Sequence, residues 1–244
     1  EMQWSLVGSE MCIRDRIRVQ HGKSAGFSTD LAGAVHVILL ADFFELGAVA
    51  MGMPLENAYL FHGHKGRDFN DSSYWKTHST ILQRAGLDLI FPTAGASEII
   101  NQTIVEQSPY DDYSESCLRS SEEGKVCGRC WKCFRKNSLK GKAVSIQGEI
   151  EVFLQKRPLK QAISTLYAIQ RLPIPQQELI KQQCPDLVEL LKEDFSLIER
   201  YYPKSLEIIP ERYREQTLKK LDEVSKPMSE NECKALLSMN LFQS

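Results

Sequence analysis

The sequence has no marked excess of charge of either sign. Its 30 Lys and Arg residues nearly balance its 32 Asp and Glu residues, which gives a formal net charge of −2 at pH 7. A protein that binds nucleic acid over its whole surface would be strongly basic, so that class is not indicated, although a local basic patch is still allowed. An apolar fraction of 42% and a charged fraction of 25% are typical of globular proteins and exclude the disordered and fibrous classes.

The sequence also lacks a long apolar run that is free of charge. The most apolar stretch, residues 31–53, contains His36, Asp42 and Glu45. A charged residue at the centre of a bilayer costs about 2.5–3.5 kcal/mol, so we expect this stretch to be a buried helix. Because the first residues show no basic segment followed by an apolar one, we expect a cytoplasmic protein in a reducing compartment.

Residues 1–16 show no clear hydrophobic period. They resemble the translated adapter sequence that sequencing can leave at the ends of metagenomic gene fragments. We therefore expect a non-native leader, and we leave it out of the fold prediction. On this interpretation the native N-terminal part of the gene lies outside the sequence.

Between residues 17 and 150, segments typical of helices alternate with segments typical of strands. The sequence predicts strands over 57–62 and 87–91, and helices over 27–53, 73–85 and 96–107. Such alternation is typical of parallel sheets with helices on their faces. The expected fold class is therefore α/β, with part of a doubly wound parallel sheet.

After about residue 150 only helical periodicity is found. The apolar positions predict helices over 159–170, 185–201, 210–224 and 229–240. Ser229 and Glu232 have the spacing of a capping box at the start of the last helix. We therefore divide the chain into the leader (1–16), an α/β domain that includes a cysteine-rich loop (17–150), and an all-helical C-terminal appendage of four or five helices (151–244).

Four of the seven cysteines lie close together, in the pattern Cys117-x9-Cys127-x2-Cys130-x2-Cys133. Four thiolates are the ligand set that tetrahedral zinc prefers, and a site with no open position is structural rather than catalytic. An iron–sulfur cluster is the chemical alternative, but the closely spaced run followed by Cys-Pro that is typical of ferredoxins is absent. The remaining interpretation is four unrelated buried cysteines.

The cysteine-rich segment resembles the zinc loop of 7-cyano-7-deazaguanine synthases. SESC at 114–117 and VCGRCWKC at 126–133 match the Ser-Cys and Cys-Gly-x-Cys-x-x-Cys of that loop, which precedes a basic helix. The upstream order also agrees: an apolar helix, a strand that ends in a glycine, a polar loop with an aromatic residue, a strand before Pro92, and a helix that carries Glu98. The resemblance covers residues 27–140.

The resemblance implies an N-type ATP pyrophosphatase with a doubly wound α/β fold. Such enzymes use ATP and Mg²⁺ to activate the carboxylate of 7-carboxy-7-deazaguanine, and ammonia then gives the amide and the nitrile on the route to queuosine-type 7-deazapurines. The sequence contains no Ser-Gly-Gly-x-Asp-Ser phosphate-binding loop, and Ser97 stands where that family often has Lys. We therefore expect an incomplete chain from a distinct subfamily, with ATP and Mg²⁺ bound by the intact protein.

The resemblance and the predicted strand ends together suggest three substrate-contacting residues: His62, Tyr74 and Glu98. His62 and His64 follow a strand, where α/β proteins place ligands, although loop histidines are usually solvated. For Tyr74, as for Trp75 and His78, packing in the core is the alternative role. Glu98 has the alternative of favouring the dipole at the start of a helix. Asp68 and Asp71 could approach Mg²⁺, or they could form turns. His36 is expected to be a core histidine.

A basic stripe follows the cysteines. Lys132, Arg135, Lys136 and Lys140 recur at intervals of three and four residues and therefore share one helix face. The stripe could contact nucleotide phosphate or RNA, or it could be a solvated face.

The sequence thus favours an ATP-dependent ligase that resembles 7-cyano-7-deazaguanine synthase, with structural zinc and a carboxylated purine-like substrate, and with a homodimer as a further expectation. Two alternatives stay open. One is a zinc-ribbon module that binds nucleic acid through the basic stripe. The other is a tRNA-modifying relative of the ATP pyrophosphatases, which would need cysteines available for sulfur transfer.

Overall fold

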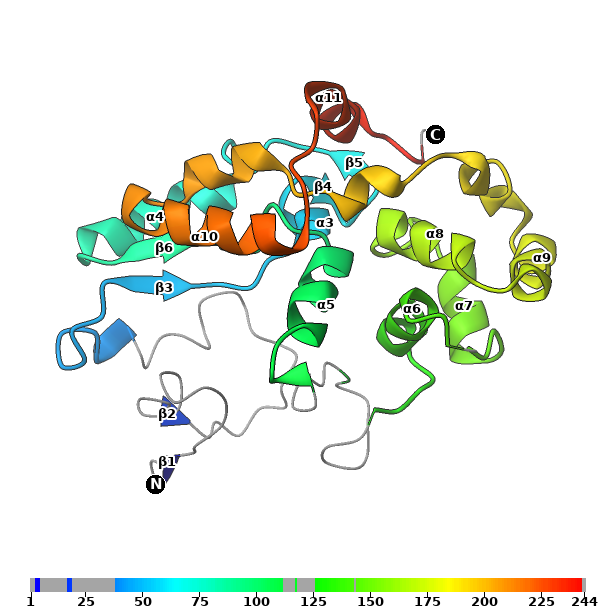
Figure 1. The fold of residues 1–244 in the computed structure, drawn as a ribbon, viewed down its shortest axis with the longest axis horizontal. Coiled ribbons are helices and arrows are strands. Elements are labelled where there is room, and N and C mark those ends of the chain that lie inside the picture. The colour runs from blue at the N-terminus through cyan, green and yellow to red at the C-terminus, as the bar shows by residue number, and fades with distance from the viewer. Residues whose placement is uncertain are drawn as a thin grey trace.

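The computed structural model describes residues 38–111, 117, 126–142 and 144–242 and, for the backbone alone, two short antiparallel strands, β1 (Gln3–Trp4) and β2 (Ile17–Arg18). This part of the chain is a mixed α/β structure in which helices predominate (Figure 1). The other elements are β3 (Ala48–Ala50), α3 (Leu55–Ala58), β4 (Leu60–Phe61), β5 (Lys65–Gly66), α4 (Ser73–Arg84), β6 (Asp88–Ile90), α5 (Glu98–Glu106), α6 (Trp131–Leu139), α7 (Glu149–Gln155), α8 (Ala162–Gln170), α9 (Ile174–Gln183), the 3₁₀ helices η3 (Pro185–Leu187), η4 (Leu190–Lys192), η5 (Ser196–Glu199) and η6 (Pro203–Ile208), α10 (Glu211–Val224) and α11 (Glu230–Ser238).

Strands β3 and β6 form a two-stranded parallel sheet. Ala48 lies opposite Asp88, and Ala50 lies opposite Ile90. Helix α4 packs beside β6, and α10 lies across the same region (Figure 1). The predicted strand over 87–91 and the parallel pairing are therefore confirmed, whereas the doubly wound arrangement, which needs more strands than two, stays a proposal.

The apolar segment before Pro54 is not the long helix that the sequence predicted over 27–53. Residues 27–37 lie outside the described residues, residues 40–45 form turns, and residues 48–50 are strand β3. The periodicity of an apolar run does not distinguish a buried helix from a buried strand. Here residues 48–50 pair with β6, and this pairing makes them a strand. The prediction of a helix up to residue 53 was wrong.

The predicted strand over 57–62 is also corrected. Its first half belongs to the short helix α3, and only Leu60 and Phe61 form a strand, β4, which pairs antiparallel with β5. The turn between them places His62 and Gly63 in the left-handed region, with φ of 50° and 79°. A hairpin here reverses the chain, so the strand cannot extend into the parallel sheet.

The helices over 73–85, 96–107, 159–170, 210–224 and 229–240 are confirmed within a few residues, as α4, α5, α8, α10 and α11. The helix over 185–201 was wrong, because this segment folds into η3, η4 and η5. Asp194 accepts hydrogen bonds from the backbone and the hydroxyl of Ser196, and such local bonds compete with a continuous helix. Helices α7 and α9 were not predicted.

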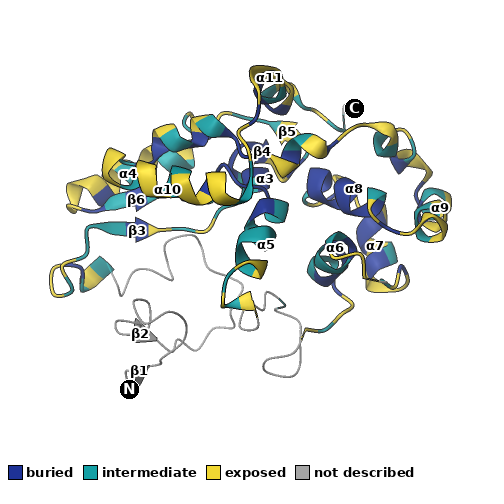
Figure 2. Cartoon of the chain, viewed as in Figure 1, coloured by how far each residue is buried: buried dark blue, intermediate teal, exposed yellow. Residues whose placement is uncertain are grey.

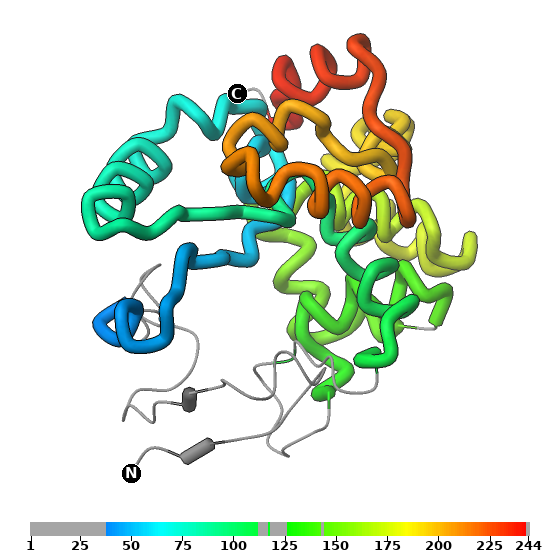
Figure 3. The backbone as a smooth tube through the Cα atoms, turned by 60° about the vertical axis from the view of Figure 1, so that its left-hand side comes forward, coloured from blue at the N-terminus to red at the C-terminus, as the bar shows by residue number. Residues whose placement is uncertain are grey.

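One apolar core joins the parts of the chain before and after residue 150. It contains Leu89 and Phe91 from the sheet region together with Leu166, Ile198 and Leu236 from the helical region. Helix α8 is buried on every side, as Figure 2 shows, with α6 packed against it. Figure 3 shows α10 and α11 lying over the earlier strands and helices. The predicted boundary near residue 150 thus falls between segments that share a core.

Among the described residues, no helix has the length and the apolar character that crossing a membrane requires.

Candidate metal centre and adjoining pocket

Cys117, Cys127, Cys130 and Cys133 converge on one point, with all four sulfur atoms within 4.8 Å of one another. The Sγ atoms of Cys130 and Cys133 are 3.5 Å apart, and those of Cys127 and Cys133 are 3.8 Å apart. Zinc–sulfur bonds of about 2.3 Å in a tetrahedron would place the sulfur atoms about 3.8 Å apart. The four thiols therefore form a group that could hold a metal ion such as zinc, as the spacing predicted.

The local backbone explains how the sulfur atoms converge. Cys130 is the N-cap of α6, and Cys133 lies in the first turn of the same helix. Gly128 has φ of 70°, a left-handed conformation that glycine adopts without strain, and it turns the chain between Cys127 and Cys130. The backbone N–H of Cys127 also donates to the Sγ of Cys117 over 3.3 Å.

Without a cation the thiols of Cys127 and Cys133 would stay protonated at neutral pH. Burial and the adjacent Cys130 thiol raise the pKa of Cys133 to about 12, and burial also raises the pKa of Cys127. None of the described cysteines forms a disulfide. A bound metal ion would supply the positive charge that stabilises the thiolates.

A cavity of about 1170 Å³ adjoins this centre, and Cys117 and Cys133 form part of its wall. It opens beyond the carboxyl ends of both parallel strands, at Gly52 after β3 and Pro92 after β6. Helices α5 and α6 form two further walls, and α10 contributes Tyr213 and Lys220. In α/β proteins ligands bind at this edge of a parallel sheet. Its volume is somewhat above the usual range for small-molecule sites, about 300–1,000 Å³.

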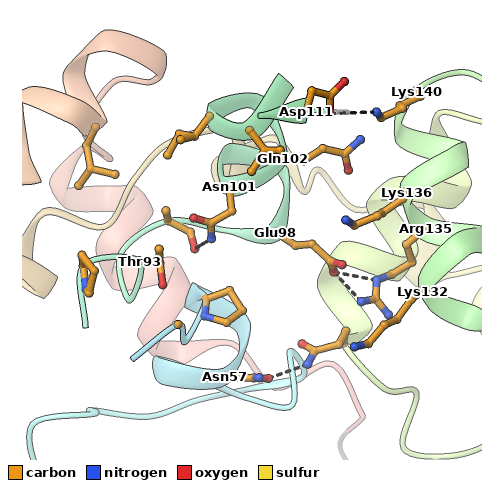
Figure 4. Close-up of a pocket in the computed structure, with 18 of the residues that line it drawn as sticks. Asn57, Thr93, Glu98, Asn101, Gln102, Asp111, Lys132, Arg135, Lys136 and Lys140 are labelled. Carbon is orange, nitrogen blue, oxygen red and sulfur yellow. Dashed lines mark hydrogen bonds and ion pairs between the residues drawn. The ribbon is translucent and has the colours of Figure 1, made fainter. Parts of the chain in front are cut away.

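The predicted basic stripe faces this cavity. Figure 4 shows Arg135 of α6 paired with Glu98 of α5, with Lys136 on one side of this pair and Lys132 on the other, toward Asn57. Arg135 is buried, and its Nε and Nη2 atoms donate to Oε2 of Glu98 over 2.8 and 2.6 Å. Lys140 pairs with Glu106 over 2.9 Å. Glu98 and Glu106 of α5 therefore neutralise part of the positive charge of the stripe, which is not simply a solvated face.

Sequence reasoning missed Glu56, which is fully buried behind the cavity wall. Its carboxylate accepts the backbone N–H of Glu98 over 2.9 Å, and the Ser164 hydroxyl also donates to it. Burial and the nearby Glu98 raise its pKa above the usual value. Glu56 thus joins α3, the start of α5 and α8. A lone Glu in a short apolar segment gives no sequence signal of such a role.

Of the three predicted substrate-contacting residues, Glu98 alone is among the residues that line the cavity. His62 is exposed in the turn between β4 and β5. Tyr74 lies on α4, where its ring packs near those of Phe69, Phe91 and His78.

The other candidates make local contacts. Asp71 pairs with Lys76, and Asp68 accepts the backbone N–H of Asn70, which are the turn roles considered for them. The Nδ1 atom of His78 lies 2.8 Å from the carbonyl oxygen of Tyr74. His64 lies between the rings of Phe61 and Phe242. His36 lies outside the described residues.

The fold and the site define a mixed α/β protein with a four-cysteine centre that could hold a metal ion beside a large basic cavity. Residues 77–240 match the model of the family of unknown function DUF6395. The chain therefore belongs to this family. No curated protein and no solved structure matches the chain.

Proposed function

We propose that this chain is part of an ATP-dependent carbon–nitrogen ligase that resembles the 7-cyano-7-deazaguanine synthases. Its substrate would be a carboxylated purine-like molecule, and its metal centre would hold one structural zinc ion on Cys117, Cys127, Cys130 and Cys133. The observation that carries the proposal is the large cavity at the carboxyl ends of β3 and β6, with the four-cysteine centre at its wall.

The four-cysteine centre would act by positioning. Cys130 is the N-cap of α6 and Cys133 lies in its first turn, so an ion bound there would fix the start of the helix that carries Lys132, Arg135 and Lys136. Adenylation converts a carboxylate oxygen into a good leaving group, and cations near the reacting phosphate stabilise the charge that develops. The described residues of the cavity offer such cations, but these 244 residues contain no Ser-Gly-Gly-x-Asp-Ser loop to hold ATP.

The proposal requires that such a loop be encoded upstream, so it is tested with the product of the intact gene. We expect this protein to release pyrophosphate from ATP only when a carboxylated 7-deazapurine is present, and to do so over many turnovers, with release of AMP, only when ammonia is added as well. The measurement is release of pyrophosphate, with the uncarboxylated 7-deazapurine as the control. Lack of turnover with every carboxylated deazapurine tried would refute the ligase.

The alternative of a nucleic-acid module has less support from the geometry. Arg135 is buried against Glu98, and Lys140 pairs with Glu106, so two of the four cations in the stripe already have carboxylate partners. Tight, salt-dependent binding of RNA that is lost in Lys132→Gln and Lys136→Gln variants, without ATP turnover, would favour the module over the ligase.

A further inference from the structure

Three polar side-chain atoms in the wall of the cavity are buried without a hydrogen-bond partner among the described residues. They are Nη1 of Arg135, Oε1 of Gln102 and Oε1 of Gln161. Leaving such an atom unpaired destabilises the folded state, and a charged group does so more strongly, so buried polar atoms are rarely left without a partner. One donor and two acceptors in a single cavity therefore point to groups supplied by a ligand.

The donor has a fixed orientation. Nε and Nη2 of Arg135 are held by Glu98, and the guanidinium carbon lies 4.3 Å from the centre of the Trp131 ring. The third nitrogen, Nη1, is left to donate. Glu98 is thus a positioning residue, which aims a planar cation without occupying all of its donors.

The charge around Arg135 favours an anion. Six cationic side chains line the cavity, against the two carboxylates of Glu98 and Asp111. Lys132 and Lys136 form no ion pair with any residue that the structure describes, and both extend toward the cavity beside Arg135 (Figure 4). Lys132, Arg135 and Lys136 lie close together on α6, so their three side chains would surround a single anionic group.

The opposite part of the cavity is apolar. Pro54, Ile90, Pro92, Ala96 and Leu221 contribute to its wall. This surface suits the flat or apolar body of a ligand, and the cations suit an anionic group at one end of that body.

Gln161, with φ of 50°, lines the same cavity in a left-handed conformation that is uncommon for a residue other than glycine. Its backbone conformation helps to place the side chain in the wall.

We propose that the cavity binds a small amphipathic anion whose carboxylate or phosphate group is held by Arg135, Lys132 and Lys136. The body of the molecule lies against the apolar wall, and the carbonyl oxygens of Gln102 and Gln161 accept its N–H groups. The inference deepens the proposed function and rests on it, since a carboxylated purine and a nucleotide are both anions of this kind.

The test uses two matched pairs of probes with the purified 244-residue protein and isothermal titration calorimetry. AMP and adenosine differ by a phosphate, and orotate and uracil differ by a carboxylate. We expect the charged member of at least one pair to bind at least about tenfold more tightly than its neutral counterpart. The pair that shows the preference identifies the anionic group. Equal binding within both pairs, or no binding of any probe, would overturn the inference.

Two variants test whether the preference for the charged probe depends on α6. Lys136→Gln removes one cation from the cavity, whereas Lys234→Gln removes an exposed cation from α11 and serves as the matched control. We expect Lys136→Gln to reduce the preference for the anion by at least about fivefold and Lys234→Gln to leave it unchanged. Equal effects of the two variants would mean that net charge, and not this site, attracts the anion. Both variants change a partly or fully exposed side chain, so folding is preserved.

The test of the anion site and the test of the proposed ligase can give different results. Binding of the anion by wild type without ATP turnover in the intact gene product would refute the ligase and keep the anion site. Turnover that is unaffected by Lys136→Gln, together with equal binding of charged and neutral probes, would refute the anion site and keep the ligase.

Discussion

Among single residues, the candidate site brings together a few side chains whose partners lie far away in the sequence. Cys117 meets Cys133, and Glu98 meets Arg135, which is 37 residues later. Each of these contacts joins α6 to a segment that precedes it. The ion pair joins the middle of α6 to α5, and an ion bound by the four cysteines would also fix its start.

The first prediction concerns the metal centre. Wild-type protein should contain about one zinc ion per chain, and Cys130→Ala should contain close to none, because three thiolates bind zinc far less well than four. Elemental analysis of the purified protein measures the zinc content. Cys233→Ala, which removes a buried thiol outside the centre, is the control and should keep its zinc. Equal zinc contents in all three proteins would show that the cysteines are not ligands.

The second prediction concerns the ion pair. Glu98→Gln should lower the free energy of unfolding by about 2 kcal/mol, because it leaves the buried Arg135 guanidinium without a countercharge. Denaturation in urea measures the change. Glu178→Gln removes the exposed partner of Lys181 and should cost less than about 0.5 kcal/mol. Similar losses in the two variants would show that burial adds nothing to the Glu98–Arg135 pair.

At the scale of elements, Glu56 connects three helices. It lies in α3, accepts the first backbone N–H of α5, and accepts the hydroxyl of Ser164 in α8. Ser97 caps the same helix start, since its Oγ accepts the N–H of Ile100 over 3.2 Å. The beginning of α5, and with it Glu98, is therefore held by two side chains.

The third prediction follows from the raised pKa of Glu56. The folded state holds the proton on this carboxyl more tightly than the unfolded state, so the contribution of Glu56 to stability falls as the pH rises above its usual pKa of 4.5 and levels off above its folded pKa. Glu56→Gln cannot titrate. The stability of the variant relative to wild type should therefore be constant below about pH 4.5 and increase as the pH rises beyond it.

Urea denaturation at a series of pH values measures this difference. Glu149→Gln, at an exposed position in α7, is the control and should not follow the same curve. A difference between Glu56→Gln and wild type that is independent of pH from 4 to 8 would contradict the raised pKa.

In the part of the chain that the structure describes, the parallel sheet and the helices after residue 150 share one apolar core. The apolar core contains residues of β3 and β6 as well as residues of α8 and α11. Arg212 of α10 donates to the carbonyl oxygen of Gly47 and pairs with Asp88, so α10 is also fixed to the sheet. The helical region thus completes the structure on which the cavity depends.

The fourth prediction is that the protein unfolds in one cooperative transition. Because the core crosses residue 150, neither part can lose its packing without exposing the apolar surface of the other. Circular dichroism and tryptophan fluorescence should therefore give the same midpoint in thermal unfolding. Two separate transitions would show that the parts before and after residue 150 are independent domains.

The features that depend on local chemistry could be predicted from the amino-acid sequence alone. Ser229 and Glu232 form the predicted capping box of α11, and the spacing of Cys127, Cys130 and Cys133 places their sulfur atoms together. In both cases the interacting groups lie within a few residues, so a turn or the start of a helix brings them together. The helices α4, α5 and α10 were predicted for a similar reason, since each carries its own periodicity and termini.

The features that depend on distant partners could not be predicted from the sequence, because they form only when the chain folds. Residues 48–50 are a strand because β6 pairs with them. The segment after Pro185 carries apolar residues at helical spacing and yet folds into short 3₁₀ helices. The buried role of Glu56 and the cavity between α5 and α6 come from contacts across 37 or more residues. Local propensity carries no information about such contacts, because packing free energy is gained only when the whole core assembles.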